Sequence, residues 1–385
     1  YEIGVRLVGS EMCIRDSSLV SPLSNLLVLW AAPFLFGFAL VLTPLTLILP
    51  AATPLLALPE MLADYLLTVA GALAKLPGHA VYFTGIHMVA WLVFCYLLIV
   101  VCLLSRERKR KYAFATVLAV VGLLAARSLP GLAVGANQLT MVAVDVGQGA
   151  ATLLHSGEET VLVDCGSLYT PLGPGTLVAD TMASYGWNHL DKMVLTHYHE
   201  DHAGGLGELL ARMKIGELLL PQLSDSEDQG TLQAEVLLLA EKYGVPVTYV
   251  EEPYCETMGE AELTIYPPLT EGDVNEEGLT ILCTAGDFDV LITGDMGSTT
   301  EKLLVETYDL PDIEVLVVGH HGSKYATTEE LLEAVTPEIG VISVGENNFG
   351  HPTAEAMDRM AWQGMTLYRT DLQGNIVIQV GEEDR

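Results

Sequence analysis

The sequence predicts a chain in two parts: apolar membrane helices, followed by a water-soluble α/β domain in which helices cover a mixed two-layer sheet. The first observation is that 50% of the 385 residues are hydrophobic although the net charge is −31. The second is that residues 1–136 hold nine Lys+Arg and six Asp+Glu, a net of +3, whereas residues 137–385 hold nine and 43, a net of −34. The third is the alternation of short β-rich and helical segments after residue 137. A single soluble domain is therefore excluded. So is a disordered acidic tail, because the acidic part is dense in Val, Leu and Ile.

Residues 1–17 fit neither part. The run VGSEMCIRDS, Val8 to Ser17, resembles a translated sequencing-adapter read, and it lacks the apolar core and cleavage pattern of a signal peptide. We expect a sequencing artefact, and a short polar loop between membrane spans is the alternative. On the first interpretation the natural protein begins with further membrane segments.

Residues 18–136 predict transmembrane and amphipathic helices. No charged residue lies between Ser17 and Pro59, which allows one kinked span or two short ones, because about 20 apolar residues in a helix cross a bilayer. Apolar residues then recur at helical spacing over residues 58–76, interrupted by Glu60, Asp64 and Lys75. That pattern predicts an amphipathic helix at the membrane surface or against other spans. Two further spans are predicted near residues 88–105 and 112–129.

A basic loop predicts the orientation of the membrane part. Arg106–Lys111, RERKRK, holds five basic residues between two apolar segments. Short basic loops stay in the cytoplasm, so we expect the next span to exit and residues 137–385 to lie outside. A nucleic-acid or nuclear-targeting patch is the weaker alternative, because a span flanks the loop on each side. The sequence thus predicts a multi-pass protein of the cell membrane, in contact with lipid, whose C-terminal domain is extracytoplasmic.

In residues 137–385 we expect strands where β-branched and aliphatic residues cluster, and helices where apolar residues recur at helical spacing. The expected strands are LTMVAVDV, TVLVDCG, KMVLTH, ELLL, VPVTYV, LTIYP, LTILC, DVLIT, EVLVV and IGVIS. The expected helices lie near residues 204–213, 232–243, 299–308, 328–335 and 354–362. This alternation predicts a mixed two-layer sheet covered by helices. Cys165, Cys255 and Cys283 are odd in number without C-x-x-C spacing, so no disulfide framework is predicted.

The densest chemistry lies in THYHEDHAGG, directly after a predicted strand. His197 and His199 are two residues apart at a strand exit, so they point the same way and can bind one metal ion. Asp201 and His202 can turn toward a second ion. A solvated polar loop is the alternative, and the specificity of the H-x-H-x-D-H pattern makes it a weak one.

Two later strand ends carry further metal-type ligands. Asp295 follows the buried strand of DVLITGDM, where a lone carboxylate is costly unless it binds a cation or a helix N-terminus. His320 and His321 follow the strand of EVLVVGHHGSK. Taken alone, Asp295 has a fair alternative as a turn residue, and the histidines as a surface pair. Together with H-x-H-x-D-H they predict a site in which a carboxylate bridges two ions about 3.5–4 Å apart and a shared water is activated.

These motifs resemble those of one family. VDVGQGAATLL, VLVDCGS, THYHEDHAGG, ITGDM, VVGHHGSK and ISVGENNFGHPT stand in the order and spacing of the metallo-β-lactamase-type domain of the ComEC competence proteins. Residues 18–136 resemble the end of that family's membrane channel domain. The resemblance implies a metallo-β-lactamase-like αββα sandwich over residues 137–385, preceded by transmembrane α-helices. It also implies a metal-dependent hydrolase that degrades the non-transported strand while single-stranded DNA is taken up in transformation.

The resemblance also implies the roles of individual residues. His197 and His199 would bind one divalent ion, and Asp201, His202 and His320 the other, with Asp295 between them. The two ions would be zinc or manganese. The implied catalytic residues are Asp201, Asp295 and His321. The residues implied to support the ligands or to contact substrate are Asp145, Gln148, Asp164, Asn275, Ser323, Lys324 and His351.

The chain departs from the family pattern at three points. Ala150 stands where the first motif commonly has a second aspartate, and Gly278 stands where an N-x-x-S element has serine. Both changes bear on substrate positioning rather than on a metal ligand. No histidine lies between residues 203 and 319, so the first ion would lack the third histidine of other superfamily members. Water or His351 would complete it, and His351 is equally well explained as a turn residue.

The leading hypothesis is a membrane-bound nuclease joined to a DNA-uptake channel. Its partners would be single-stranded DNA and the competence proteins that deliver it, and a homo-oligomer is left open. The net charge of −34 counts against unaided DNA binding, since nucleic-acid binders usually present a basic face. The alternatives are an extracytoplasmic phosphodiesterase that acts on an envelope polymer or a small phosphodiester, and a catalytically weakened domain that gates the channel.

Overall fold

The computed structural model describes residues 3–8, 16–18, 21–74, 80–82, 85–104, 111–134, 137–170, 172–224, 230–271 and 273–381. The chain forms two compact units, one of Ile14–Thr84 and one of Tyr1–Cys13 with Gly85–Arg385. Most of the run interpreted as an artefact (residues 9–15) lies outside the described residues, as does most of the basic loop (residues 105–110).

The first unit consists of apolar helices. Its elements are β2 (Asp16–Ser18), α1 (Ser21–Val28), α2 (Ala31–Ile48), η2 (Pro50–Leu56), α3 (Ala57–Ala74) and β3 (Ala80–Tyr82). The stretch Leu23–Ile48, with a mean hydropathy of 2.3, is the one described stretch long and apolar enough to cross a membrane as a helix. Helix α3 packs against it, since the Tyr65 hydroxyl donates a 3.0 Å hydrogen bond to the Leu27 carbonyl.

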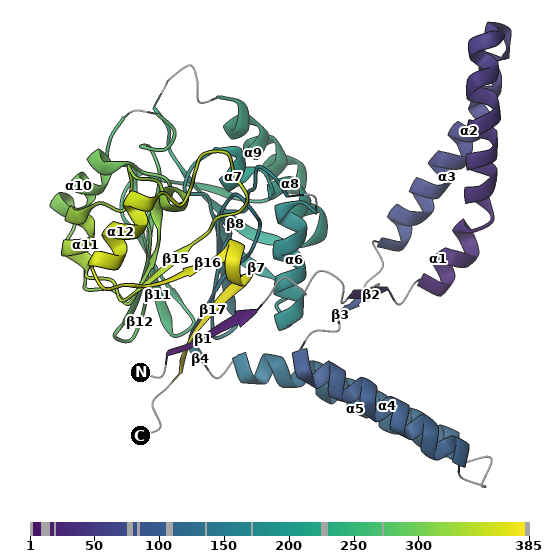
Figure 1. Cartoon of the computed structure of the whole chain (residues 1–385), viewed down its shortest axis with the longest axis horizontal. Helices are drawn as coiled ribbons and strands as arrows, with labels where there is room; N and C mark the ends of the chain where they lie inside the picture. The colour runs from purple at the N-terminus through teal and green to yellow at the C-terminus, as the bar shows by residue number, and fades with distance from the viewer. Residues whose placement is uncertain are drawn as a thin grey trace. The chain divides into compact units, whose positions relative to one another are not determined.

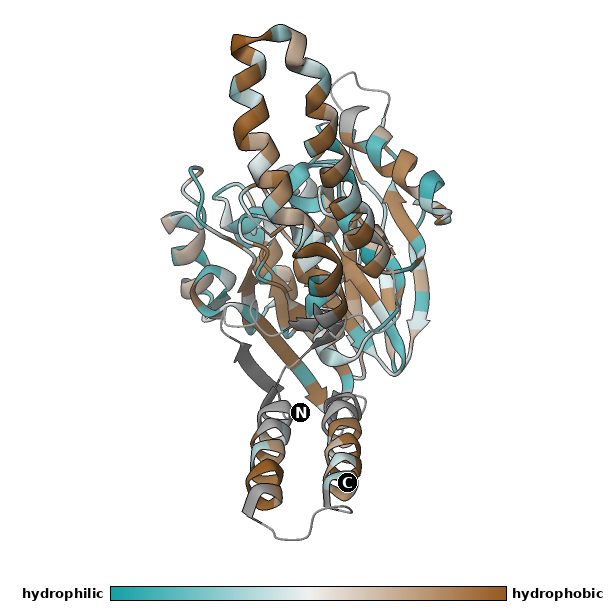
Figure 2. Cartoon of the chain, turned by 90° about the vertical axis from the view of Figure 1, so that its right-hand side faces the viewer, coloured by the Kyte–Doolittle hydropathy of each residue, from teal (hydrophilic) through white to brown (hydrophobic). Residues whose placement is uncertain are grey.

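Two more apolar helices precede the α/β domain in the sequence. They are α4 (Gly85–Leu104) and α5 (Lys111–Val134), and they cover the two ranges expected for later spans. Trp91 Nε1 of α4 donates a 2.8 Å hydrogen bond to the Ala119 carbonyl of α5, so the two helices pack together. Their described apolar stretches, Val93–Cys102 and Phe114–Ala125, are shorter than a full span. Most residues of these helices are hydrophobic (Figure 2), and many of their large hydrophobic side chains are exposed.

The α/β domain is the expected αββα sandwich (Figure 1). The strands of its first sheet, in spatial order, are β1 (Ile3–Val8), β17 (Asn375–Gly381), β4 (Asn137–Ala143), β5 (Thr152–Ser156), β6 (Glu159–Val163), β7 (Leu190–Val194), β8 (Ile215–Pro221) and β9 (Val247–Val250). Those of the second are β10 (Tyr254–Met258), β11 (Ala261–Tyr266), β12 (Thr280–Ala285), β13 (Phe288–Ile292), β14 (Val315–Val317), β15 (Ile339–Ile342) and β16 (Thr366–Arg369).

Helices cover the outer face of each sheet. The helices between consecutive strands of the first sheet are α6 (Pro174–Tyr185), α7 (Glu200–Ala203), α8 (Leu206–Arg212) and α9 (Gly230–Tyr243). Those between the strands of the second sheet are α10 (Ser298–Thr307), η3 (Gly319–Gly322), α11 (Glu329–Val335) and α12 (Ala354–Trp362), and α13 (Thr370–Gln373) comes after its last strand in the sequence. The sequence analysis did not predict β5, β10, β16, β17 or α6.

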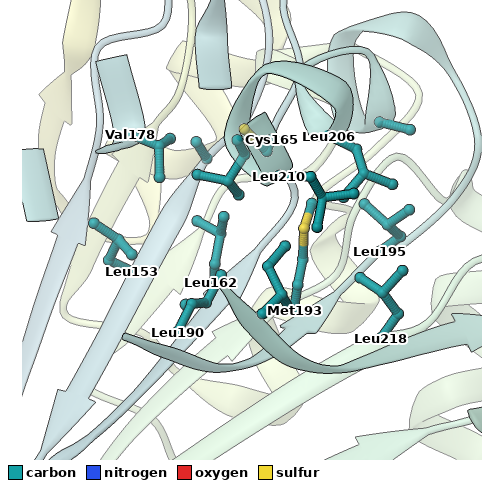
Figure 3. Packing of buried hydrophobic residues seen from close by; sticks show 14 of the residues in the cluster. Leu153, Leu162, Cys165, Val178, Leu190, Met193, Leu195, Leu206, Leu210 and Leu218 are labelled. Atoms are coloured by element: carbon teal, nitrogen blue, oxygen red, sulfur yellow. The ribbon is translucent and has the colours of Figure 1, made fainter. Parts of the chain in front are cut away.

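Three apolar clusters hold the layers together, because successive side chains of a strand point to opposite faces of its sheet. In β4, Val142 packs toward the helices, whereas Met141 and Ala143 face the second sheet. Figure 3 shows Val178 of α6 and Leu206 of α8 packed over strand residues such as Leu162. Strands buried on both faces explain the nearly unbroken Val, Leu and Ile runs in the sequence.

Parallel pairing brings the chemistry to one edge. Strands β6 to β9 are parallel, and so are β13 to β16. In such sheets the loops after the carboxyl ends of the strands lie at a common edge, where α/β proteins bind ligands. The loops after β6, β7, β13 and β14 carry Asp164, the H-x-H-x-D-H run, Asp295 and the histidine pair.

Candidate metal centre

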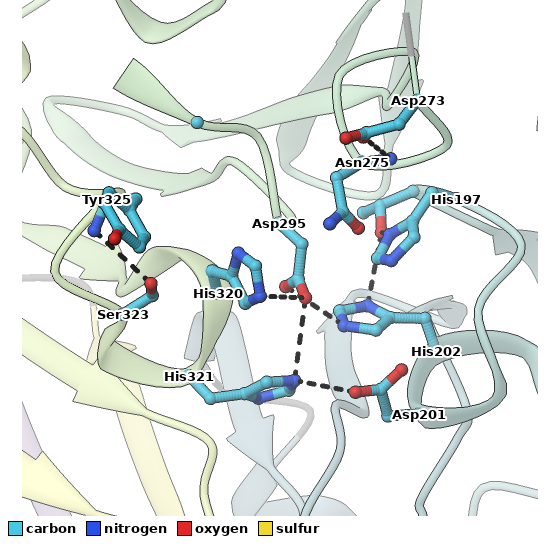
Figure 4. A network of polar contacts seen from close by, with 12 residues as sticks. His197, Asp201, His202, Asp273, Asn275, Asp295, His320, His321, Ser323 and Tyr325 are labelled. Carbon is cyan, nitrogen blue, oxygen red and sulfur yellow. Dashed lines mark hydrogen bonds and ion pairs between the residues drawn. The ribbon is translucent and has the colours of Figure 1, made fainter. Parts of the chain in front are cut away.

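Four side chains from three of these loops meet at one point (Figure 4). One ligand atom from each of Asp201, His202, Asp295 and His321 lies within 4.8 Å of those of the other three. His202 Nε2 is 3.1 Å from Asp295 Oδ1, and His321 Nε2 is 3.4 Å from Asp201 Oδ2. His321 Nε2 also lies 3.8 Å from Asp295 Oδ2. Two carboxylates and two imidazoles at this spacing form a group that can surround a divalent cation.

The imidazoles are held by their Nδ1 atoms. His202 Nδ1 is 2.7 Å from Asp164 Oδ2, and His321 Nδ1 is 2.8 Å from the Ser343 carbonyl oxygen. Because both partners are acceptors, each Nδ1 carries a proton, which leaves Nε2 as the nitrogen of each ring that can bind an ion. Carboxylates and carbonyls behind a metal-binding histidine fix its tautomer and orientation in this way.

The Nε2 atoms of His197, His202 and His321 are buried without a hydrogen-bond partner. The 3.1 Å contact of His202 with Asp295 therefore lacks hydrogen-bond alignment, and it matches the spacing of two ligands on one ion. Unpaired buried polar atoms are rare because each costs about 1–3 kcal/mol. Three of them beside two carboxylates fit a metal ion.

Asp164 supports the site from beneath. Its backbone has a φ of 61°, in the left-handed region that residues with a side chain seldom adopt. Its carboxylate accepts hydrogen bonds from the Thr196 amide (2.7 Å) and hydroxyl (2.8 Å) as well as from His202. Thr196 Oγ1 in turn lies 3.0 Å from His197 Nδ1. Asp164 and Thr196 thus orient two histidines, and the strained turn persists because this network holds it.

Charge is concentrated in the buried site. Burial alone would raise the pKa of the Asp295 carboxyl, but the His202 and His321 imidazoles hold that pKa well below its usual value. Burial opposes the ionised form of Asp201 as well, yet the neighbouring His321 imidazole, whose Nε2 lies 3.4 Å from Asp201 Oδ2, lowers the pKa of that carboxyl to about 2. Conversely, burial lowers the pKa of His197 well below its usual value, so this imidazole is neutral. The site therefore offers ionised carboxylates and at least one neutral imidazole, which is the donor set of a divalent ion.

The two adjacent histidines occupy different places. His320 and His321 both have positive φ, 50° and 53°, and this turn sends the His321 ring into the four-residue group. His320 stays at the rim, 30% exposed, with Nε2 3.7 Å from Asp295 Oδ2. The family resemblance implied His320 as the ligand and His321 as a catalytic residue, whereas it is His321 that lies inside the group.

The other expected metal ligands lie beside the group. His199 is exposed, and its ring is 4.9 Å from that of the buried His197. The ring of His351 is 5.6 Å from that of His320, and its Nδ1 is buried without a hydrogen-bond partner. Asn275 Oδ1 is likewise buried and unpaired, and Figure 4 shows its side chain beside His197.

The remaining expected residues lie in the loops around the site. Buried Gln148 accepts a 3.3 Å hydrogen bond from the Gly345 amide, which ties the loop after β4 to the loop after β15. Asp145 accepts a hydrogen bond from the Gly147 amide, and burial raises the pKa of its carboxyl. Ser323 is buried directly after the histidine turn, and Lys324 is exposed next to it.

The positions that depart from the family pattern lie close to the centre. Ala150 lines a cavity of about 20 Å³ together with Asp164, His202, His321 and Ser343. That volume suits one water molecule, and the Ser343 hydroxyl beside it is otherwise unpaired. A side chain at Gly278 would meet the Asn275 carbonyl at 3.2 Å, so serine there would require a small shift of this loop.

Sequence reasoning missed Thr196 and Ser343. Thr196 directly precedes the first histidine of the motif, so its position after the strand was a usable signal. Ser343 contributes a backbone carbonyl, for which residue type carries no signal.

Two family sequence models and several known proteins match parts of this chain. Residues 144–346 match the sequence model of the metallo-beta-lactamase superfamily, and residues 11–108 match that of a family described as Competence protein. ComE operon protein 3 of Bacillus subtilis is 27% identical over 60% of this chain and 32% of its own length. Competence protein ComA of Neisseria gonorrhoeae is 30% identical over 94% of this chain and 48% of its own length. The chain thus spans about half the length of these relatives or less. The metallo-beta-lactamase fold protein YhfI of Bacillus subtilis aligns with 63% of this chain and 99% of its own at 14% identity and a TM-score of 0.43.

Proposed function

Since the chain belongs to the metallo-β-lactamase superfamily and to the ComEC family of competence proteins, we propose that its C-terminal domain is a metal-dependent nuclease. Its substrate is the DNA strand that is not transported, and the reaction is hydrolysis of phosphodiester bonds. One observation carries the proposal: three unpaired buried imidazole nitrogens lie beside two ionised carboxylates at the loop edge of the sandwich.

We propose that the site binds two ions, zinc or manganese. Asp201, His202 and His321 would hold one of them, His197 and His199 would hold the other, and Asp295 would serve both. When bound, such ions lower the pKa of a water and neutralise charge on a phosphate. The protein's own part is positional. Asp164 and the Ser343 carbonyl keep the Nε2 atoms of His202 and His321 directed inward, and His320 and Lys324 present donors at the rim where a phosphate would enter.

The membrane arrangement is part of the proposal. The helices α1 to α5 form the end of a multi-pass channel domain, with the loop between α4 and α5 in the cytoplasm and the α/β domain outside. Proteins that deliver DNA are the expected partners, because the domain's net charge of −34 repels free DNA. A homo-oligomeric channel fits this arrangement.

The acidic surface favours one alternative, a phosphodiesterase for an envelope polymer or a small phosphodiester. A small substrate needs no extended basic face. The water-sized cavity beside Ala150 favours another, a catalytically weakened domain that gates the channel, because the usual carboxylate is missing there.

The test is Asp295→Asn in the full chain, purified in detergent and assayed on single-stranded DNA and on a chromogenic phosphodiester with zinc and then with manganese. The amide keeps the shape of the carboxylate but not its charge, so two cations would repel each other with less compensation. We expect loss of bound metal and a fall in rate of about 10³-fold or more. The circular dichroism spectrum should not change.

Asp312→Asn is the matched control, because Asp312 is an exposed carboxylate bonded to Thr336. If the wild-type protein hydrolyses the chromogenic phosphodiester but not single-stranded DNA, the small-substrate alternative is favoured. A fully metal-loaded wild type without activity on either substrate would favour the gating domain.

A further inference from the structure

Two exposed aromatic side chains lie on loops that also carry residues of the site. Tyr325 is 66% exposed and Phe349 is 56% exposed, although both follow buried strands of a well-packed domain. Tyr325 comes three residues after the end of the turn that carries the histidine pair, and Figure 4 shows it on that side of the site. Phe349 comes from the loop after β15, which also carries His351.

The aromatic rings form a series that runs from the metal group to the surface. His320 Nε2 is 3.7 Å from Asp295, and the His320 ring is 5.6 Å from the ring of His351. The His351 ring is 6.0 Å from that of Phe349, with an interplanar angle of 35°. A flat ligand group resting on Phe349 would therefore belong to a molecule whose neighbouring part reaches the ions.

The loop holds Phe349 in place. The Asn347 side-chain oxygen accepts hydrogen bonds from the amides of Phe349 (3.0 Å) and His351 (3.1 Å). Its side-chain nitrogen donates to the carbonyls of Gly345 (2.9 Å) and His351 (2.8 Å). One asparagine thus fixes the loop at four points. An apolar ring held in water on a fixed loop is a preorganised contact surface.

A cation accompanies the second ring. Lys324 Nζ lies 5.0 Å from the centre of the Tyr325 ring. Within the part of the chain that the structure describes, Lys324 has no carboxylate partner, whereas Lys192, Arg212 and Arg369 pair with carboxylates. In a domain with 43 acidic residues, an unpaired lysine beside an exposed ring combines a site for a phosphate with a site for a flat group.

We propose that Phe349 and Tyr325 form a stacking subsite for the bases of the proposed single-stranded substrate, on the two loops that also carry the histidine pair and His351. The inference rests on the proposed phosphodiesterase function. Stacking on an exposed ring requires a free base face, which a single strand offers and an intact duplex covers. It also explains how so acidic a domain holds DNA, because stacking needs no basic face.

The test measures binding separately from hydrolysis. The full chain in detergent is titrated, with calcium in place of the catalytic ion, into a fluorescent short oligothymidylate, and then into an oligomer of equal length with abasic sites. Phe349→Ala and Tyr325→Ala should each raise the Kd for oligothymidylate by about tenfold and leave the Kd for the abasic oligomer unchanged. Phe349→Trp should keep wild-type affinity, because it restores a flat ring.

Tyr243→Ala is the matched control. Lys242 Nζ lies 5.1 Å from the Tyr243 ring, which repeats the Lys324–Tyr325 pair. Tyr243 ends α9, which returns the chain to the start of β9, so this pair lies at the sheet edge opposite the site. Equal weakening for both oligomers, no weakening, or the same loss in Tyr243→Ala would overturn the inference. If the variants bind only oligothymidylate more weakly and the wild-type protein with manganese hydrolyses no DNA, the stacking inference stands and the proposed nuclease function is wrong.

Discussion

At the scale of single residues, the decisive feature is the left-handed turn at His320 and His321. Two neighbouring imidazoles leave this turn in different directions, one into a buried group of ligands and the other to the rim. Metal binding should therefore depend on them unequally.

His321→Ala should lose bound metal, whereas His320→Ala should retain most of it. The His321 imidazole contributes an unpaired buried Nε2 beside two carboxylates, and removing one ligand typically leaves an ion weakly bound. Metal content of both purified variants, measured by elemental analysis, tests this. Equal loss in the two would place His320 among the ligands.

A second residue predicts how stability depends on pH. His155 is buried against the Trp187 ring, 4.3 Å away, and burial lowers its pKa from 6.5 to about 4. The unfolded chain binds a proton near pH 6.5 and the folded chain does not, so stability is full above pH 6.5 and falls as the pH drops toward 4. The loss should reach about 3 kcal/mol at most.

Denaturant unfolding followed by Trp187 fluorescence at several pH values measures this loss. His155→Phe should flatten the dependence, because its ring still stacks on Trp187 but does not titrate. His189→Gln should leave it unchanged, since His189 is exposed. If the stability of His155→Phe still falls with pH as in the wild type, a group other than His155 binds the proton.

The sequence predicted which residues gather at one edge of the sheet, but not which histidine of the adjacent pair turns into the candidate metal site. H-x-H-x-D-H, Asp295 and the pair all lie at strand ends, and the carboxyl ends of parallel strands meet at one edge. Which of two adjacent histidines turns inward depends on backbone φ, and a motif does not report φ.

At the scale of elements, the histidine turn depends on a carboxylate in a neighbouring helix. Glu301 of α10 is fully buried and accepts hydrogen bonds from the amides of Thr327 and Thr328, just before α11. The Thr327 hydroxyl accepts from the Gly319 amide, at the start of the turn. Glu301 thus joins two helices to the loop that carries the ligands.

Glu301→Ala should lower the free energy of unfolding by about 3 kcal/mol and weaken metal binding. It leaves two buried amides without an acceptor, each costing about 1–3 kcal/mol. Thermal unfolding, with metal content measured in parallel, tests this. Glu306→Ala on the exposed side of α10 is the control, because its contact with Lys302 is 3.8 Å long and exposed. A similar small effect in both variants would remove Glu301 from the support of the site.

Sequence reasoning missed several elements, each for a physical reason of its own. Helix α6 begins at Pro174 and ends before Gly186, whose φ of 82° is the usual helix stop, but the glycines on either side of Pro174 are typical of a loop. Strand β5 follows the Gly147–Gly149 turn too closely to stand out from β4. Strand β17 is specified by pairing with β4, a contact between distant parts of the chain that local pattern does not reveal.

At the scale of the whole molecule, the sequence predicts two parts of opposite character, and the structure contains both. Apolar helices occupy the first third, and a metallo-β-lactamase sandwich follows. The prediction that the sandwich lies outside the cytoplasm rests on the basic loop between the last two apolar helices, and a topology measurement tests it.

A reporter active only in the cytoplasm should stay silent when it is fused after Arg385 and should be active when it is inserted within the basic loop Arg106–Lys111. Five basic residues in a short loop hold that loop inside, and a single span then carries the domain out. The inserted reporter verifies expression and membrane insertion. Strong activity from the Arg385 fusion would show that the C-terminal domain lies in the cytoplasm, opposite to the predicted orientation.

The pairing of β17 with β4 has a consequence for when the enzyme becomes active. The backbone amide of Asp145 donates a hydrogen bond to the side-chain oxygen of Asn375 in β17, 230 residues later, so the first sheet is completed only after nearly the whole domain has been synthesised. Under the proposed orientation, that moment comes after export. The ligands then assemble beyond the cytoplasm and take their ions from that compartment. If the domain has the proposed nuclease activity, this order of assembly would keep it latent while it is near the cell's own chromosome, without a separate inhibitor during its synthesis.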